Sequence, residues 1–255
     1  MEKTEENPRD VPESQGEAKP MDFSSLPEFP HTANFWKKYG QLPQVLEYFH
    51  RGEHIKIPAF YFLELPPERQ LEIAHSLALA TVNDRRELVY EIGFGQSLSP
   101  VDTAFAGKDR TVIAVDPKGE FYGRVRAGLE SLKLPAPESY SLAALFKLYA
   151  GELTGSRKFP RSSWVQSFSP YPNMVKEIAA TGSKLSDNVY VVLNPMAIEA
   201  NSLDKMTKNL PQGFACKIKH LTKTQIEELL GTTMSAFLGG TPTEGKVPVL
   251  EAHRK

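Results

Sequence analysis

The sequence has very little cysteine and no long apolar run. Cys216 is the single cysteine among 255 residues, which excludes an internal disulfide and a thiolate metal cluster and fits a reducing compartment. The longest charge-free apolar stretch, around Val189 to Ile198, contains Asn194 and Pro195 and is far too short to cross a bilayer. The six histidines show no metal-ligand spacing. We therefore predict a cytoplasmic protein with no membrane partner and no metal.

The sequence also has little net charge, and that charge is unevenly spread. There are 30 Lys+Arg against 31 Asp+Glu, but the first thirty residues hold eight acids, three bases and five prolines. Because this segment has almost no aliphatic side chains to bury, we predict a disordered acidic tail over residues 1–25. It also lacks the cationic start and apolar stretch of a secretory signal.

Basic residues gather in one later segment of the chain. Between Asn201 and Lys223 the sequence has one acid, Asp204, and five lysines: Lys205, Lys208, Lys217, Lys219 and Lys223. A solvated lysine-bearing face is the favoured interpretation, since so small a net charge does not indicate nucleic-acid binding by itself. A phosphate-facing surface is the alternative.

The hydrophobic pattern divides the rest of the chain in two. With 40% hydrophobic and 24% charged residues, the composition is typical of a globular domain, and the length suffices for a sizeable core. From Phe35 to about Arg85 the spacing is helical, first through Leu42, Val45, Leu46 and Phe49. Pro66 and Pro67 suit the first turn of a second helix. We predict an N-terminal helical element over residues 26–86.

From Leu88 onward, short apolar runs alternate with amphipathic segments, which predicts a mostly parallel sheet with helices on both faces. The seven strand candidates are Leu88–Ile92, Thr111–Asp116, Phe146–Ala150, Trp164–Phe168, Val189–Leu193, Phe214–His220 and Val247–Ala252. Ser99 and Pro100 are suited to begin one helix, and Asn173 to cap another over residues 174–183. Residues 141–153 fit a helix as well as a strand. The predicted α/β domain spans residues 87–255.

One stretch carries most of the information about function. Glu91-Ile92-Gly93-Phe94-Gly95 ends the first predicted strand, and Asp116 ends the second, 21 residues after Gly95. A glycine turn at the carboxyl end of a strand lets a ligand approach the backbone, and the next helix presents free N–H groups there. A carboxylate at the end of the second strand is suited to accept both hydroxyls of a ribose. Together they predict a nucleoside-binding crevice, the alternative being two plain turns.

A nicotinamide dinucleotide is a poorer ligand for this turn. Such a site needs a third glycine where the chain has Leu98, because that glycine allows close helix packing around the pyrophosphate. Glu91, two residues before Gly93, instead favours a ligand with a positive charge where a dinucleotide has phosphates. These features argue against a nicotinamide-dependent oxidoreductase.

Glu91 to Gly95, followed by Asp116, resembles motif I and the next acidic position of class I S-adenosylmethionine-dependent methyltransferases. The resemblance covers about Glu87 to Lys255 and implies a Rossmann-like, seven-strand, mostly parallel sheet. It implies that S-adenosylmethionine is bound by Glu91, Gly93, Gly95, Gln96 and Asp116. Ser97 departs from the family, since many members have a third glycine there. The implied partner is an unidentified methyl acceptor, which is a small molecule, a protein or RNA.

Two further segments extend the resemblance. Ala150-Gly151-Glu152-Leu153 resembles the acidic position after the third strand, which implies that Glu152 contacts the adenine; the alternative is an ordinary helix residue. Ser169-Pro170-Tyr171-Pro172 follows the fourth strand, where methyltransferases contact their substrates. Ser169 and Tyr171 are therefore predicted to face the acceptor, the alternative being a rigid loop without a catalytic role.

The resemblance leaves two functions open. The first is methyl transfer from S-adenosylmethionine, for which no dedicated general base is evident in the sequence. The second is a catalytically inactive methyltransferase-like domain that binds a nucleoside or serves as a scaffold for a protein partner. The sequence makes no prediction of an oligomeric state.

Overall fold

The computed structural model describes residues 46–50, 53–57, 59–61, 65–95, 99–107, 109–117, 141–168, 170–193, 203–230 and 245–255. The predicted tail, residues 1–25, lies outside these ranges. The strands are β1 (Leu46–His50), β2 (Glu53–Ile57), β3 (Ala59–Tyr61), β4 (Glu87–Ile92), β5 (Arg110–Val115), β6 (Leu142–Phe146), β7 (Trp164–Phe168), β8 (Asn188–Val192), β9 (Phe214–Thr222) and β10 (Lys246–Arg254). The helices are α2 (Pro67–Asn83), α3 (Ser99–Ala106), α5 (Val175–Leu185), α7 (Leu203–Thr207) and α8 (Lys223–Leu230), with a 3₁₀ helix η2 (Ala150–Thr154).

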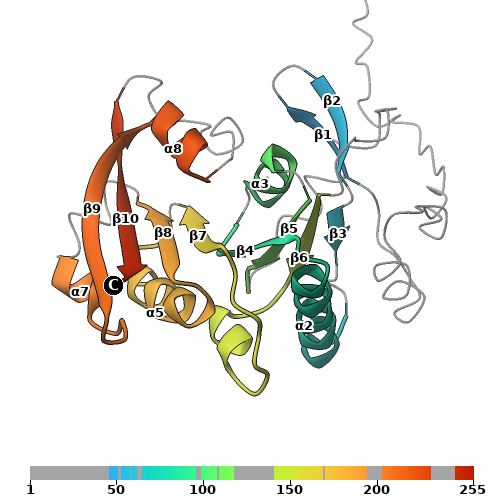
Figure 1. The fold of residues 1–255 in the computed structure, drawn as a ribbon, viewed down its shortest axis with the longest axis horizontal. Coiled ribbons are helices and arrows are strands. Elements are labelled where there is room, and N and C mark those ends of the chain that lie inside the picture. The colour runs from blue at the N-terminus through green and yellow to red at the C-terminus, as the bar shows by residue number, and fades with distance from the viewer. Residues whose placement is uncertain are drawn as a thin grey trace, which may run out of the picture.

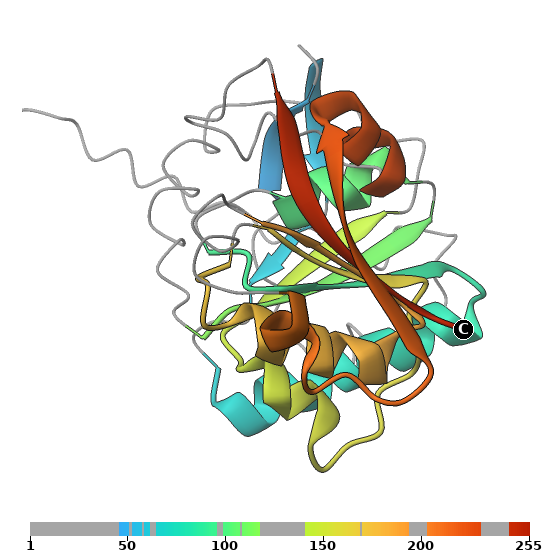
Figure 2. The ribbon, with the colours of Figure 1, turned by 90° about the vertical axis from the view of Figure 1, so that its left-hand side faces the viewer.

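In the described ranges, eight strands form one sheet in the order β3-β6-β5-β4-β7-β8-β10-β9, and β1 pairs with β2 separately. Pairing is parallel from β3 through β8, whereas β10 runs antiparallel to both β8 and β9. Helices α3 and α8 cover one face of the sheet, and α2, α5 and α7 cover the other (Figures 1 and 2). The predicted Rossmann-like α/β fold, with seven mostly parallel strands and helices on both faces, is confirmed, and β3 adds an eighth strand at its edge.

The two faces of the sheet follow from side-chain alternation along the strands. In β4, Leu88, Tyr90 and Ile92 are buried in the large core under α2 and α5. A smaller core on the opposite face includes Ile226 and Leu230 of α8. Because both faces are covered, the central strands are apolar along most of their length, as buried parallel strands require.

The prediction of a first helix in the N-terminal element is wrong. The apolar spacing from Leu42 to Phe49 predicted a helix, but Leu46–His50 and Glu53–Ile57 form the antiparallel strands β1 and β2, in which His50 pairs with Glu53; residues 42–45 lie outside the described residues. The same segment also alternates, through Leu46 and Tyr48, and a short amphipathic run fits either period. Cross-strand pairing therefore decided its structure. The second predicted helix is confirmed as α2, with Pro66 as its N-cap residue and Pro67 in its first turn.

The third predicted strand is displaced by four residues. The structure places β6 at Leu142–Phe146 rather than at 146–150, and residues 150–154 form η2 instead. The register decides this, because β6 pairs in parallel with β5 from Thr111↔Leu142 to Val115↔Phe146. All five residues of β6 are buried, whereas Lys147, which follows it, is exposed.

Helix α5 packs unusually close to the sheet. A Cβ atom added at Gly182 would lie 3.0 Å from Val189 Cγ1 and 3.1 Å from Val165 Cγ1, so only glycine lets the helix backbone approach β7 and β8 this closely. The helix begins at Val175, and its N-cap residue is Met174 rather than the predicted Asn173, with no capping bond from the side chain. The first amides of α5 thus have no side-chain acceptor at the cap position.

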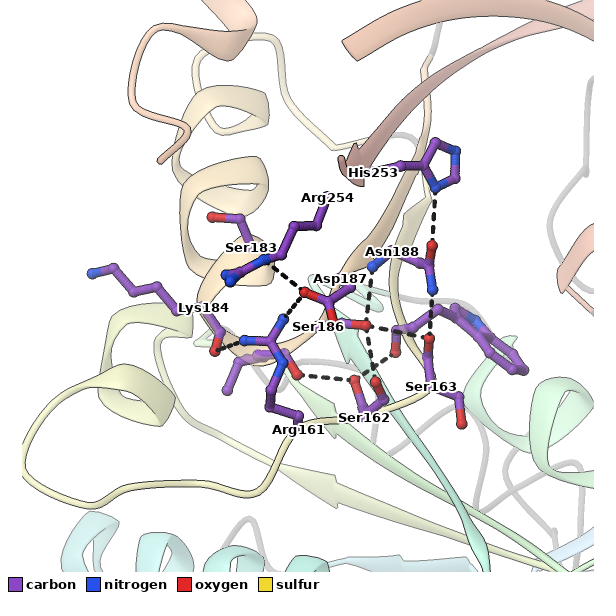
Figure 3. A network of polar contacts seen from close by, with 12 residues as sticks. Arg161, Ser162, Ser163, Ser183, Lys184, Ser186, Asp187, Asn188, His253 and Arg254 are labelled. Atoms are coloured by element: carbon purple, nitrogen blue, oxygen red, sulfur yellow. Dashed lines mark hydrogen bonds and ion pairs between the residues drawn. The ribbon is translucent and has the colours of Figure 1, made fainter. Parts of the chain in front are cut away.

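A polar network fastens the edge of the sheet where β7 and β8 begin and β10 ends (Figure 3). The Asp187 carboxylate pairs with Arg161 at 2.6 Å and with Arg254 at 2.8 Å. The Ser186 hydroxyl donates to the Ser162 carbonyl at 2.9 Å. These contacts lie at the amino ends of β7 and β8. The carboxyl ends of the strands are therefore the ends left for a ligand.

Candidate functional site

The strand order reverses at β4. Helix α3, which follows β4, lies on one face of the sheet, while α5, which follows β7, lies on the other (Figure 1). The two connections diverge beyond the carboxyl ends of β4 and β7. In open α/β sheets, ligands bind at this switch point.

The glycine turn and Asp116 meet at the carboxyl ends of β4 and β5. Gly93 and Gly95 have positive φ angles of 73° and 55°, a left-handed conformation that costs other residues roughly 1–2 kcal/mol. The Gly93 amide donates to the Val115 carbonyl at 2.8 Å, and the Gly95 amide donates to Asp116 Oδ2 at 2.9 Å. Two residues that lie 21 positions apart in the sequence are therefore hydrogen-bonded neighbours in the fold, and their predicted contact with a cofactor stays a prediction.

Gly95 is also open to its surroundings. A Cβ atom placed on Gly95 would meet no described atom within 4 Å, and the residue is exposed. Asp116 is only 8% exposed. The turn therefore offers accessible backbone beside a nearly buried carboxylate.

Ser167 supplies a polar group that the sequence analysis did not single out. Its side chain is fully buried, and its hydroxyl oxygen has no hydrogen-bond partner among the described residues. The oxygen lies 3.9 Å from the position of a Cβ atom on Gly93. Because an unpaired buried hydroxyl costs free energy, its place beside the glycine turn is a reason to expect a polar ligand atom there.

Glu91 is fully buried and is bound within the protein. The Ser99 hydroxyl donates to Oε1 of Glu91, and Gln166 Nε2 donates to Oε2 at 2.7 Å. Gln166 Nε2 also lies 2.7 Å from Thr103 Oγ1, and Trp164 Nε1 donates to Gln166 Oε1 at 2.8 Å. The Glu91 carboxylate thus ties α3 to β4 and β7 directly below the glycine turn. Its predicted contact with a cofactor stays a prediction, and its observed contacts position the turn.

The other predicted site residues do not all gather at the switch point. Glu152 lies on η2, six residues beyond the end of β6, and its Oε2 accepts the Tyr149 amide at 2.6 Å. Because β6 ends four residues earlier than predicted, Lys147 occupies the position directly after the strand. Tyr171 is 64% exposed in the loop after β7. Gln96 and Ser169 lie outside the described residues, as do Ser97 and Leu98.

A sequence signal for the missed residues does exist. Gln166 and Ser167 interrupt an otherwise apolar strand, and a polar side chain in a strand covered on both faces must find a partner. Glu91 interrupts β4 in the same way, and β4 and β7 are neighbours with Glu91 opposite Gln166. The sequence of either strand alone does not reveal that β4 and β7 are neighbours in the sheet.

S-adenosylmethionine fits the groups present at this turn. The resemblance implies that the ribose lies against Asp116 and the methionine moiety against Gly93 and Gly95. The methionine moiety needs backbone without side chains, and groups that can form hydrogen bonds with it. The left-handed glycines provide the backbone, and the Ser167 hydroxyl provides a partner. In the described part of the chain, no three His, Cys, Asp or Glu side chains are grouped to hold a metal. No helix among the same residues is long and apolar enough to cross a membrane.

Comparison with known proteins gives a mixed result. The sequence matches no protein-family model and no curated protein. Among solved structures, the 16S rRNA methyltransferase KamB is similar with a TM-score of 0.45 at 13% identity, over 83% of this chain and 100% of that one.

Two further solved structures have TM-scores between 0.41 and 0.45. The 16S rRNA (adenine(1408)-N(1))-methyltransferase from Catenulisporales acidiphilia has a TM-score of 0.45 at 15% identity, over 83% of this chain and 98% of that one. An O-methyltransferase from Bacillus cereus has a TM-score of 0.41 at 12% identity, over 76% of this chain and 84% of that one.

Proposed function

We propose that the protein is an S-adenosylmethionine-dependent methyltransferase. The observation that carries the proposal is the bond from the Gly95 amide to Asp116, which joins the glycine turn to the acidic strand end at the switch point of the sheet. The Ser167 hydroxyl beside Gly93 supports it, because it has no partner among the described residues and so marks the same turn as a place for a polar ligand. The predicted roles of Glu91, Gln96 and Glu152 in holding the cofactor belong to this proposal.

The residues of the chain have distinct roles in this reaction. When bound, S-adenosylmethionine would supply a methyl group: an acceptor atom would bond to the methyl carbon in line as the carbon–sulfur bond breaks, the electron pair staying on sulfur and the proton of the acceptor passing to solvent. Asp116 holds the ribose, and the glycine turn admits the methionine moiety. Ser169 and Tyr171, in the loop after β7, face the acceptor. The protein thereby contributes alignment and exclusion of water, which suffice for an acceptor that is already a good nucleophile.

Isothermal titration calorimetry of the full chain with S-adenosylmethionine, S-adenosylhomocysteine and NAD tests the proposal. We expect micromolar binding of the first two and none of NAD. Asp116→Ala removes charge-assisted hydrogen bonds to the ribose, which corresponds to a loss of roughly 10- to 100-fold in affinity. Asp187→Ala is the matched control, because it removes a carboxylate at the amino ends of the strands and leaves the glycine turn intact.

Circular dichroism shows whether each variant is folded. Unchanged S-adenosylmethionine affinity in folded Asp116→Ala would sink the site assignment. Binding of NAD by the folded wild-type protein would favour an oxidoreductase, and binding of none of the three ligands would favour the scaffold.

A further inference from the structure

A basic pocket lies between the start of α5 and helix α7. It has a volume of about 250 Å³ and is lined by Pro172, Asn173, Lys176, Lys205, Met206 and Lys208. Three of these six residues are lysines, and none is acidic. Lys176 is on α5, Lys205 is on α7 and Lys208 directly follows α7, so the fold rather than one run of sequence brings them together.

The five lysines noted in the sequence separate into two groups. Lys217 and Lys219 lie 3.6 and 3.0 Å from the buried Glu251 carboxylate, and Lys223 lies 3.9 Å from Glu227. Acidic side chains thus offset their charge. Lys205 and Lys208 line the pocket. Only part of the lysine-rich segment therefore has the form of an anion site.

Lys176 joins these two lysines from α5, although helix electrostatics disfavour it there. It is the second residue of an 11-residue helix, where the positive end of the helix dipole repels a cation. Met174, the N-cap residue, offers the first amides of α5 no side-chain acceptor. Lys176 and Lys208 make no ion pair with any residue that the structure describes. Glu177, in the same first turn, offsets part of this charge, and an anion in the pocket would offset the charge of Lys176 and Lys208.

The pocket lies close to the proposed acceptor side of the site. Pro172 follows Phe168, the last residue of β7, by four residues, so its Cα lies at most about 14 Å from the end of that strand. The carboxyl end of β7 adjoins β4 and the glycine turn. The pocket is therefore on the carboxyl-end side of the sheet, as the glycine turn is.

We propose that this pocket binds a phosphate group of the methyl acceptor. Its volume is below the roughly 300–1,000 Å³ of sites that enclose a drug-sized ligand, so it suits a phosphate with its adjoining atoms rather than a whole nucleoside. Lysine ammonium groups and helix amides are the donors that recognise phosphate. That the phosphate belongs to an acceptor rests on the proposed methyltransferase function, whereas phosphate binding itself does not.

Fluorescence anisotropy with a labelled single-stranded RNA oligonucleotide, titrated between about 50 and 200 mM salt, tests the pocket. The test variant is Lys176→Gln with Lys208→Gln, and the control is Lys158→Gln with Lys184→Gln. Both remove two positive charges, but Lys158 and Lys184 are exposed residues outside the pocket. We expect the test variant to lose about tenfold or more in affinity and to lower the slope of log K against log salt by about 1.4, which is 0.7 for each phosphate contact. The control variant should keep the wild-type slope.

Titration with inorganic phosphate in a calorimeter distinguishes the source of the phosphate. RNA binding that depends on the pocket lysines identifies a nucleic acid, whereas phosphate binding with the same dependence but no RNA binding identifies a small phosphorylated acceptor. If neither probe distinguishes the test variant from the control, the proposal is wrong. The melting temperature of the test variant should not fall, since Lys176 opposes the helix dipole. Titration of both variants with S-adenosylmethionine separates failure of the pocket from failure of the proposed function.

Discussion

The buried network around Gln166 should be a main determinant of stability near the site. Gln166 is fully buried and makes three contacts: with the Glu91 carboxylate at 2.7 Å, with Thr103 Oγ1 at 2.7 Å and with Trp164 Nε1 at 2.8 Å. A neutral hydrogen bond contributes about 1 kcal/mol, and a bond to a charged group about 1.5–3 kcal/mol. The substitution Gln166→Met removes all three bonds while filling most of the volume. It should lower the free energy of unfolding by about 4 kcal/mol, a large part of the 5–15 kcal/mol typical of a domain.

Urea denaturation followed by circular dichroism measures this loss. With an m-value of about 2.5 kcal/mol/M, the midpoint should fall by about 1.5 M. Gln166→Ala adds a cavity term and should be less stable still. Trp164→Phe removes one donor to Gln166 and should cost about 1 kcal/mol. A loss below about 1 kcal/mol in Gln166→Met would refute the reasoning, because the Glu91 carboxylate would then not depend on this donor.

Two further predictions concern the core. Burial raises the pKa of the Tyr90 hydroxyl, which donates to the Pro160 carbonyl at 2.9 Å. The unfolded chain ionises this group near pH 10 while the folded protein keeps its proton, so stability falls as pH rises past about 10. Tyr90→Phe should cost about 1 kcal/mol at neutral pH and reduce this fall; an unchanged alkaline profile in urea melts would contradict the assignment. Gly182→Ala gains about 1 kcal/mol of helix propensity but forces a Cβ to 3.0 Å from Val189 Cγ1, so a net loss of about 1 kcal/mol is expected, and a raised melting temperature would count against close packing.

The glycine turn and Asp116 could be predicted from the sequence because each follows from local chemistry. Gly93 and Gly95 need positive φ angles, and an acid at the next strand end is brought to them by any right-handed strand–helix–strand unit. Six of the seven strands could be placed for the same reason, since a run of apolar residues, or in β9 the alternation of apolar and polar ones, specifies a strand without knowledge of its neighbours.

Pairing between strands decided what local pattern left open. Residues 46–57 satisfied the helix period and the strand period, and the β1–β2 register chose between them. The register of β6 against β5 likewise placed Lys147, not Glu152, directly after the strand. A difference of four residues at a strand end changes which side chain meets a ligand, so this part of the candidate site depended on tertiary structure.

The sequence by itself determined the fold class, the glycine turn and the acidic strand end, because their signals lie within a few residues of one another. Only the tertiary structure decided which partners the buried polar groups have: Glu91 is bound by Ser99 and Gln166, and Ser167 lies beside Gly93 with no hydrogen-bond partner among the residues that the structure describes. It also placed Lys217 and Lys219 beside Glu251, and Lys205 and Lys208 at a pocket. The physical reason is that burial and hydrogen bonding depend on which strands and helices become neighbours, and those neighbours are distant in the chain.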